Sequence, residues 1–228
     1  IKYQKNEFKF EVKVTRSKRT RRITLRVCPI LGECRVTVPY YYNTDLLEKF
    51  ITRNLSWINS RLSERTPQVI LSEGSEVPLL GLDRKVIAKS ECRTNFHLTP
   101  NSLIIPRTDL VFRHQIKSIF FQIAQEFFIE SCNKFSQKLG VTFLKISIKD
   151  PKSRWGSCSS DKKLMFSWRL IMAPKNVSLY VAAHEIAHLI HMNHSEEFWE
   201  VVRLLFPNYR NQRTWLRKNG RSLHRFMF

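Results

Sequence analysis

The sequence predicts an α+β protein in which a mostly β N-terminal part with one helix precedes a helix-rich C-terminal part. Short segments of alternating apolar and polar residues dominate before residue 107, and helical periodicity dominates after it. With 228 residues the chain can bury a sizeable core as one domain or two small ones. We therefore expect an N-terminal β-rich domain at 1–107 and a second domain at 108–228.

Alternation predicts the first strands of the N-terminal part at 8–14, 23–27 and 35–38. A helix is expected at about 44–65, with Thr44 as its N-cap and Pro67 after its end. Further short strands are expected at 85–88, 96–98 and 102–105. Turns are expected at Gly81 and at Pro100-Asn101 between these strands.

A long helix is predicted at about 109–139 in the C-terminal part, ending at Gly140. Strands are then expected at 141–148 and 164–171. Three more helices are expected, one from about residue 177, one at 196–205 and one at about 209–218. Pro207 separates the last two helices.

The most informative motif is the H-E-x-x-H pattern at 184–188, within the largely apolar run 179–192. Positions i and i+4 share a helix face, so His184 and His188 can reach one metal ion while Glu185 lies beside it. A buried helix does not usually carry several histidines and a glutamate unless something satisfies their polar atoms. We interpret the pattern as a zinc site that activates water, rather than as a satisfied polar cluster.

The third ligand is open between His191, His194 and a later glutamate. His191 shares the helix face, but along a straight helix it lies roughly 7.5 Å beyond the middle of the histidine pair. His194 folds back only if the helix ends first, and Asn193 is a suitable stop because Asn tolerates the left-handed conformation. The acidic candidates are Glu196, Glu197 and Glu200. We favour His194, and we expect His191 to support the site or to pack.

A second segment of interest is Ser-Arg-Trp-Gly-Ser-Cys-Ser at 153–159. It predicts a strand edge and turn in which Gly156 permits close approach of the backbone. The alternative is a plain hairpin with a core tryptophan. An edge strand at this place could hold an extended substrate by main-chain hydrogen bonds.

Together these segments resemble the YgjP-like metal-dependent hydrolases, small zinc metallopeptidase-like proteins related to the SprT-type proteases. The matching pieces are SRWGSCS (153–159), WRLIMAP (168–174), YVAAHEIAHLIHMNHSEEFW (180–199), PNYRNQRTWL (207–216), TRSKRTRRITLRV (15–27) and CRVTVP (34–39). The resemblance implies a minimal zincin-like metallopeptidase domain with His184, His188 and His194 as zinc ligands and Glu185 as catalytic base. It also implies a substrate-binding segment made of Arg154, Trp155, Gly156, Ser157 and Cys158.

The sequence thus predicts a zinc-dependent hydrolase, and a metallopeptidase in particular, with Glu185 as general base for metal-activated water. Two alternatives stay open: a metal-dependent phosphohydrolase acting on nucleotides, and a nucleic-acid-associated module that keeps zinc for structure. The presence of Glu185 argues against a structural site, which needs no base. The lack of a P-loop or a second carboxylate cluster argues against the phosphohydrolase.

Charge is the other conspicuous property, because the formal net charge is +20. One basic cluster lies at 15–22, and it contains Arg16, Lys18, Arg19, Arg21 and Arg22. The stretch from Arg203 to Arg225 adds cations without any acid. Such an excess can attract nucleic acid or nucleotides, whereas a solvated basic surface is the alternative. We expect a peptide or protein substrate, with nucleic acid or a nucleotide as a further candidate partner.

The chain shows neither a long apolar run nor a recognisable signal peptide, since its first residues, IKYQKNEFKF, are polar and alternating. The five cysteines, at 28, 34, 92, 132 and 158, form no C-x-x-C pair, which favours a reducing compartment. We therefore expect a cytoplasmic protein without a membrane partner. Cys158 is expected to pack as a free thiol rather than to act as a nucleophile.

Overall fold

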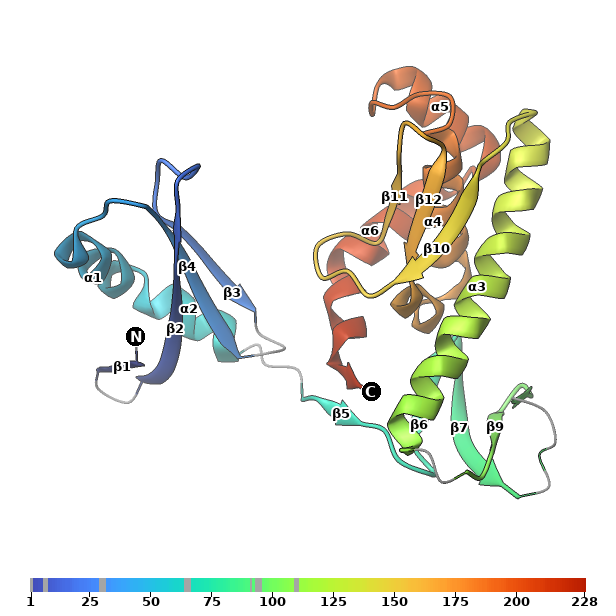
Figure 1. Cartoon of the computed structure of the whole chain (residues 1–228), viewed down its shortest axis with the longest axis horizontal. Helices are drawn as coiled ribbons and strands as arrows, with labels where there is room; N and C mark the ends of the chain where they lie inside the picture. The colour runs from blue at the N-terminus through green and yellow to red at the C-terminus, as the bar shows by residue number, and fades with distance from the viewer. Residues whose placement is uncertain are drawn as a thin grey trace. The chain divides into compact units, whose positions relative to one another are not determined.

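A computed structural model describes residues 2–5, 8–28, 32–63, 67–90, 92, 96–108 and 111–228, with side chains from residue 10 onward. Its contacts divide the chain into two compact units, unit 1 (Ile1–Gln68) and unit 2 (Val69–Phe228). Both units combine helices with sheets (Figure 1). The predicted α+β class is therefore confirmed.

Unit 1 is a four-stranded sheet with two helices. The strands are β1 (Lys2–Lys5), β2 (Phe8–Ser17), β3 (Thr24–Cys28) and β4 (Glu33–Pro39), in the order β1-β2-β4-β3. β2 and β4 are parallel, with Val12 opposite Cys34, and β3 runs antiparallel to β4. Alternate residues of these strands are buried against the helices, in a core of Val12, Cys34, Val36, Val38, Leu47, Ile51 and Ile58.

The helical segment after β4 is divided in two, where a single helix at 44–65 was expected. Helix α1 covers Thr44–Arg53 and α2 covers Leu55–Ser63. Asn54 ends α1, and its side-chain amide donates to the carbonyl of Phe50 at 2.8 Å. The N-cap is Asn43 rather than Thr44, because the Asn43 side chain accepts from the backbone N–H groups of Asp45 and Leu46.

Unit 2 begins with short strands that belong to the same core as its helices. They are β5 (Val69–Ile70), β6 (Glu76–Leu79), β7 (Leu82–Lys89), β8 (His97–Leu98) and β9 (Ser102–Pro106), and all but β5 form the sheet β6-β7-β9-β8. Buried residues of β6, β7 and β9 pack in one cluster with helix α3 (Phe112–Leu139). The contacts therefore divide the chain between Gln68 and Val69, whereas we expected a boundary near residue 108.

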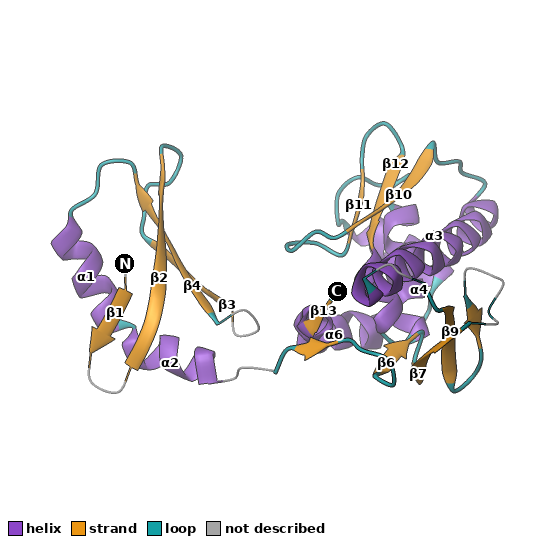
Figure 2. Cartoon of the chain, turned by 60° about the horizontal axis from the view of Figure 1, so that its bottom comes forward, coloured by secondary structure: helices purple, strands orange, loops and turns teal. Residues whose placement is uncertain are grey.

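The expected long helix is present as α3, which ends at Gly140 in the left-handed conformation with φ 66°. It runs from the sheet β6-β7-β9-β8 to a second sheet of order β10-β12-β11 (Figures 1 and 2). That sheet consists of β10 (Lys145–Lys149), β11 (Gly156–Cys158) and β12 (Lys163–Ser167), with β11 at its edge. The Phe128 ring of α3 stacks on Phe166 of β12, with centroids 4.2 Å apart.

The prediction of a strand through residue 171 was wrong, because the strand ends at Ser167 and a 3₁₀ helix, η1 (Trp168–Met172), follows. The Leu170 and Ile171 carbonyls accept from the Ser178 hydroxyl and from the backbone N–H of Leu80, so other segments bind the backbone there. The remaining elements are α4 (Lys175–Ala187), α5 (Glu196–Leu205), α6 (Tyr209–Asn219), η2 (Gly220–Arg225) and β13 (Phe226–Met227), which pairs with β5.

Arg169 of η1 forms hydrogen bonds that connect the C-terminal segment of unit 2 to the rest of this unit. Its guanidinium binds the Asp150 carboxylate at 2.7 and 3.1 Å and donates to the carbonyls of Leu223 and Phe226 at 3.1 Å each. These bonds hold η2 and β13 against the core. In the described part of the chain, no helix is long and apolar enough to cross a lipid bilayer.

Candidate metal centre

Helix α4 carries the first two histidines of the site on one face. It is almost fully buried, because most of its residues from Val177 to Ala187 are apolar and belong to the core of unit 2. His184 lies in its last turn and His188 is its C-cap, so the two imidazole rings lie one turn apart, with centroids separated by 4.9 Å. The buried helix α4 therefore positions both rings close to each other.

A tight turn after α4 brings His194 back to this pair. The helix ends at Ala187, and i→i−3 bonds from Leu189 to Ile186 and from Ile190 to Ala187 tighten the exit. As a result, Nε2 of His194 lies 3.1 Å from Nε2 of His184. The predicted return of His194 is therefore observed in the geometry.

Asn193 does not have the role that we expected, since α4 ends before it. Among the described residues other than glycine, a positive φ occurs at Leu80 and Lys162 and not at Asn193. The Asn193 side chain instead accepts from the backbone N–H of Ser195 at 3.3 Å, just before α5. The i→i−3 hydrogen bonds after α4 end the helix without a residue in the left-handed conformation at position 193.

His191 contributes its backbone to the site. Its carbonyl oxygen lies 2.9 Å from Nδ1 of His188. A carbonyl can only accept, so Nδ1 of His188 donates and the Nε2 of a neutral ring keeps a free lone pair. This bond fixes the orientation of the His188 ring, as partners of metal-binding histidines commonly do.

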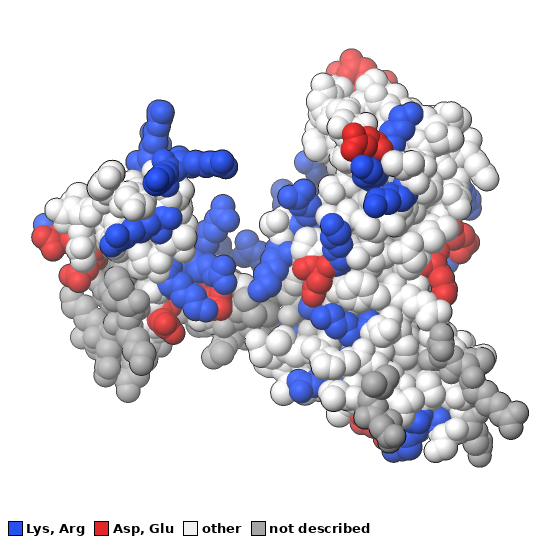
Figure 3. All heavy atoms as spheres, viewed as in Figure 1, with Lys and Arg blue, Asp and Glu red and all other residues white. Residues whose placement is uncertain are grey.

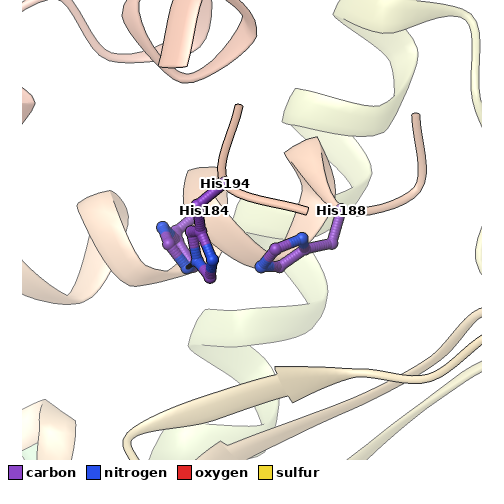
Figure 4. Close-up of side chains that lie close together, drawn as sticks. All are labelled: His184, His188 and His194. Carbon is purple, nitrogen blue, oxygen red and sulfur yellow. Dashed lines mark hydrogen bonds between the residues drawn. The ribbon is translucent and has the colours of Figure 1, made fainter. Parts of the chain in front are cut away.

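The three histidines form a donor set that suits zinc. Their ligand nitrogens all lie within 4.8 Å of one another (Figure 4). In a tetrahedral zinc site, two nitrogens that each lie about 2.05 Å from the ion are about 3.3 Å apart. The separation of 3.1 Å between His184 and His194 is close to that value. The three imidazoles therefore form a donor set that could hold a metal ion.

Burial favours the neutral form of His184 and His188, which is the form that binds metal. Burial, followed by electrostatic interactions with the neighbouring His188 and His194 and with Arg213, lowers the pKa of His184 to about 3. Burial also lowers the pKa of His188, although the bond to the His191 carbonyl opposes this change. Nδ1 of His184 is buried without a hydrogen-bond partner among the described groups.

The acidic alternatives for a third ligand lie outside this group. Among the described residues, the structure assembles His184, His188 and His194 as a potential metal site, without Glu196, Glu197 or Glu200. All three glutamates are exposed near the start of α5 or along it. Glu200 contacts Arg203 at 3.4 Å.

Glu185 follows His184 in α4, and its carboxyl group lies in the protein interior. Its side chain is 4% exposed, and Oε2 has no hydrogen-bond partner in the described part of the chain. Burial raises the pKa of Glu185 to about 8, against the opposing charge of Arg154. The carboxyl group is therefore isolated from other protein acceptors and donors at this oxygen.

Gly156 of β11 makes room for this carboxylate. A Cβ atom at position 156 would lie 2.8 Å from both Cγ and Cδ of Glu185. The predicted close approach of the backbone at Gly156 is therefore observed, and its partner is Glu185.

The other residues of the 154–158 segment divide between the site and the core. Arg154 is exposed, and its charge acts on Glu185. The Trp155 ring lies 5.3 Å from the His224 ring and close to Gly220, so it packs against the C-terminal segment. Ser157 pairs with Met165 in the sheet. Burial and the charge of Glu185 raise the pKa of Cys158 to about 11, so it stays a thiol at neutral pH.

Aromatic residues that the sequence reasoning overlooked surround the histidines. Phe198 and Trp199 of α5 lie against them, with centroids 4.5 Å from His188 and 5.8 Å from His194 respectively. Tyr180 lies 6.0 Å from His184. Their closeness in sequence to the motif was the available signal, since Phe198 and Trp199 follow His194 within five residues.

A comparison with family models matches residues 21–219 to the YgjP-like metallopeptidase domain. The chain belongs to the YgjP-like family. The match extends from unit 1 through helix α6, and it confirms the resemblance inferred from the motifs. The YgjP-like chain is therefore a metallohydrolase of the peptidase class.

Two solved structures resemble parts of this YgjP-like protein. The metallopeptidase zymogen of Pyrococcus abyssi abylysin is 22% identical over 44% of this chain and 99% of its own, with a TM-score of 0.37. The metallopeptidase zymogen of Methanocaldococcus jannaschii jannalysin is 20% identical over 42% of this chain and 96% of its own, with a TM-score of 0.36. A comparison with curated proteins gave no match.

Proposed function

We propose that this YgjP-like protein is a zinc-dependent peptidase in which His184, His188 and His194 hold the ion and Glu185 is the general base. One observation carries this proposal: the ligand nitrogens of three imidazoles lie within 4.8 Å of one another, and the residue that follows the first of these histidines carries a buried carboxyl group. Three protein ligands leave a fourth position for water, as in catalytic rather than structural zinc sites.

A zinc ion in this site would supply a bound water of lowered pKa and a Lewis acid for a carbonyl oxygen. Glu185 has one oxygen free of hydrogen-bond partners among the described groups, and a cation bound by the histidines would favour the ionised carboxylate, whose free oxygen can accept a proton. The same carboxyl group then donates the proton to the leaving amine. Gly156 keeps the space that this carboxylate occupies, and the His191 carbonyl keeps the His188 ring in orientation.

The substrate is proposed to bind along β11. This strand is at the edge of its sheet, pairs with β12 and contacts α4, which carries the histidines. An extended peptide can add to such an edge by main-chain hydrogen bonds. We assign substrate contact to Arg154 and to the backbone of Gly156, Ser157 and Cys158, and a supporting role to the packed side chain of Trp155.

The decisive experiment compares the wild-type chain with Glu185→Gln. Both proteins are analysed for zinc and are offered a peptide library and a set of nucleotides, with products followed by mass spectrometry. We expect the variant to retain zinc and lose peptide turnover by about 10²–10⁴-fold, because it removes the base and no ligand. Glu197→Gln, at an exposed glutamate of α5, is the matched control. Peptide cleavage by Glu185→Gln at a wild-type rate, or hydrolysis of nucleotides alone, would contradict the proposal.

A second candidate function, binding of nucleic acid by unit 1, is favoured by its basic loop between β2 and β3. Lys and Arg side chains gather at this loop and at the end of β2 (Figure 3), and the exposed ones are Arg16, at the end of β2, and Lys18, Arg19, Arg21 and Arg22 of the loop. The Arg16 guanidinium lies 5.3 Å from the centroid of the Tyr42 ring, and the Lys18 ammonium lies 5.4 Å from that of Tyr40. Tyr41, which lies between these two tyrosines in the sequence, is 91% exposed. Cations with an exposed aromatic ring suit phosphates and stacked bases.

The five cysteines are free thiols in the structure. Free thiols are typical of reducing compartments, so a cytoplasmic location remains our proposal for this protein.

A further inference from the structure

A pocket of about 440 Å³ lies between α5 and α6, and the residues that line it have no role in the proposed hydrolysis. It is lined by Trp199, Tyr209, Arg210, Arg213, Thr214 and Arg217, so three of its six lining residues are arginines and none is acidic. Its volume is in the range of about 300–1,000 Å³ that ligand pockets occupy. We call it the arginine pocket.

The spacing along α6 concentrates the charge of the arginine pocket on one helix face. Arg210, Arg213 and Arg217 are separated by three and four residues, which places them side by side on an α-helix. No carboxylate of the described residues lies within 4.0 Å of them, and residues 201–228 contain no Asp or Glu. Within the part of the chain that the structure describes, these three neighbouring positive charges therefore have no negative partner.

Trp199 joins the arginine pocket to the metal centre. Its ring lies 5.8 Å from His194 and 5.7 Å from His184, measured between centroids. The Arg213 guanidinium carbon lies 4.6 Å from the centroid of the same ring, and Tyr209 stacks on Trp199 at 5.3 Å. Arg213 and the two histidines therefore lie against the same aromatic ring.

The chemistry of this wall favours recognition of a planar anion. A guanidinium group stacked on an indole is held in a fixed plane, which reduces the entropy it loses when it binds. Its N–H groups match the two oxygens of a carboxylate in a bidentate pair. Peptides present carboxylates either on acidic side chains or at the C-terminus.

We propose that the arginine pocket binds a carboxylate of the peptide substrate, next to the bond that is cleaved. This inference rests on the proposed peptidase function and adds the substrate class to it. The pocket then selects peptides that carry an acidic residue or a free C-terminus near the scissile bond. Arg213 is the central specificity residue, because it contacts the aromatic wall of the metal site.

The test measures binding without cleavage, using full-length, zinc-loaded protein with Glu185→Gln. The probes are dansyl-labelled hexapeptide pools in four matched forms, with acidic residues either present or replaced by Asn and Gln, and with a C-terminal carboxylate or carboxamide. We expect the pool without carboxylates to bind at least about tenfold more weakly than the best carboxylate-bearing pool. Arg213→Gln should abolish this difference. Lys218→Gln removes one charge from α6 outside the pocket and should preserve it.

The four pools also identify the source of the carboxylate. Loss of binding on amidation assigns the pocket to the C-terminus, and loss on replacement of acidic residues assigns it to a side chain. Equal binding of all pools, an unchanged preference in Arg213→Gln, or an equal loss in Lys218→Gln would overturn the proposal. Binding of ATP at the pocket without binding of any peptide pool would also overturn it.

Zinc content and cleavage by the chain with Glu185 are measured in parallel, so that the two proposals fail differently. Cleavage of peptides without any carboxylate preference overturns the role of the arginine pocket and leaves the peptidase intact. A zinc-loaded chain that neither binds nor cleaves peptides overturns both.

Discussion

Gly156 of β11 lies directly against Glu185 of α4, so closely that a methyl group at position 156 would meet Cγ and Cδ of the glutamate at 2.8 Å. Strand β11 can thus lie close to helix α4 because residue 156 has no side chain. This relationship links the two motifs of the sequence, since one residue of the 153–159 segment determines the space left for the carboxylate of the H-E-x-x-H pattern.

Gly156→Ala should therefore displace the Glu185 carboxylate while leaving the histidines in place. A displacement of about 1 Å in a catalytic group costs up to about 10² in rate, so we expect a loss of turnover of roughly tenfold to hundredfold. Steady-state kinetics and zinc analysis of the same samples measure both properties. Ser157→Ala, in the same strand, is the control. Full activity in Gly156→Ala would show that the carboxylate position does not matter.

Single alanine variants test the proposed ligand set. His184→Ala, His188→Ala and His194→Ala should each lose tightly bound zinc, because two remaining imidazoles hold the ion more weakly. His191→Ala should retain zinc, since His191 contributes its backbone carbonyl, which alanine also has. Metal analysis of the purified variants measures this. Zinc retained in His194→Ala but lost on substitution of Glu196, Glu197 or Glu200 would assign the third ligand elsewhere.

The ion pair of Asp150 with Arg169 predicts a pH-dependent contribution to the stability of unit 2. Burial raises the pKa of Asp150, but the hydrogen bonds and charge of Arg169 outweigh it, and the net effect is a lowered pKa. A lowered folded-state pKa stabilises the protein above the unfolded value of about 3.9, and this stability is lost as pH falls through the folded value.

Asp150→Asn should accordingly reduce the free energy of unfolding by about 1–3 kcal/mol at pH 7. The variant and the wild type should converge as the pH falls below about 4, where the wild-type carboxylate takes up a proton. Urea unfolding at several pH values measures the difference. Asp161→Asn, which removes an exposed pair with Lys163, is the control and should have little effect. A difference that is independent of pH would contradict this account.

The basic loop of unit 1 predicts salt-dependent binding of nucleic acid. Replacement of Arg16, Lys18, Arg19, Arg21 and Arg22 by Gln should flatten the linear dependence of log K on log salt, because fewer phosphates are neutralised. Tyr41→Ala should weaken binding of single-stranded DNA more than duplex, since stacking requires an unpaired base. Titrations at several salt concentrations measure both effects. Absence of binding at low salt would refute this second function.

Local sequence was sufficient for the helical half of the site. The spacing of His184 and His188 predicts a shared face because the helical period is a local property, and α4 carries both rings on that face. Gly140 predicted the end of the long helix for the same kind of reason, since only a short stretch of backbone is involved. The YgjP-like motifs likewise sufficed to assign the family.

Sequence-based predictions were wrong where hydrogen bonds or core packing with distant segments decide the structure. The strand expected to reach residue 171 ends at Ser167, because the Leu170 and Ile171 carbonyls bind Ser178 and Leu80 instead of a neighbouring strand. The segment 69–106 joins unit 2 because its apolar side chains complete the core around α3, a choice that no local pattern reveals.

The sequence by itself determined the fold class, the family, the helix that carries His184 and His188, and the imidazole character of the candidate ligands, because these depend on periodicity and residue type. Only the tertiary structure decided which groups meet around that helix. Packing at long range places Gly156 against Glu185 and Arg213 over Trp199. These contacts join residues from separate elements, and their geometry follows from the burial of a common core rather than from local conformational preference.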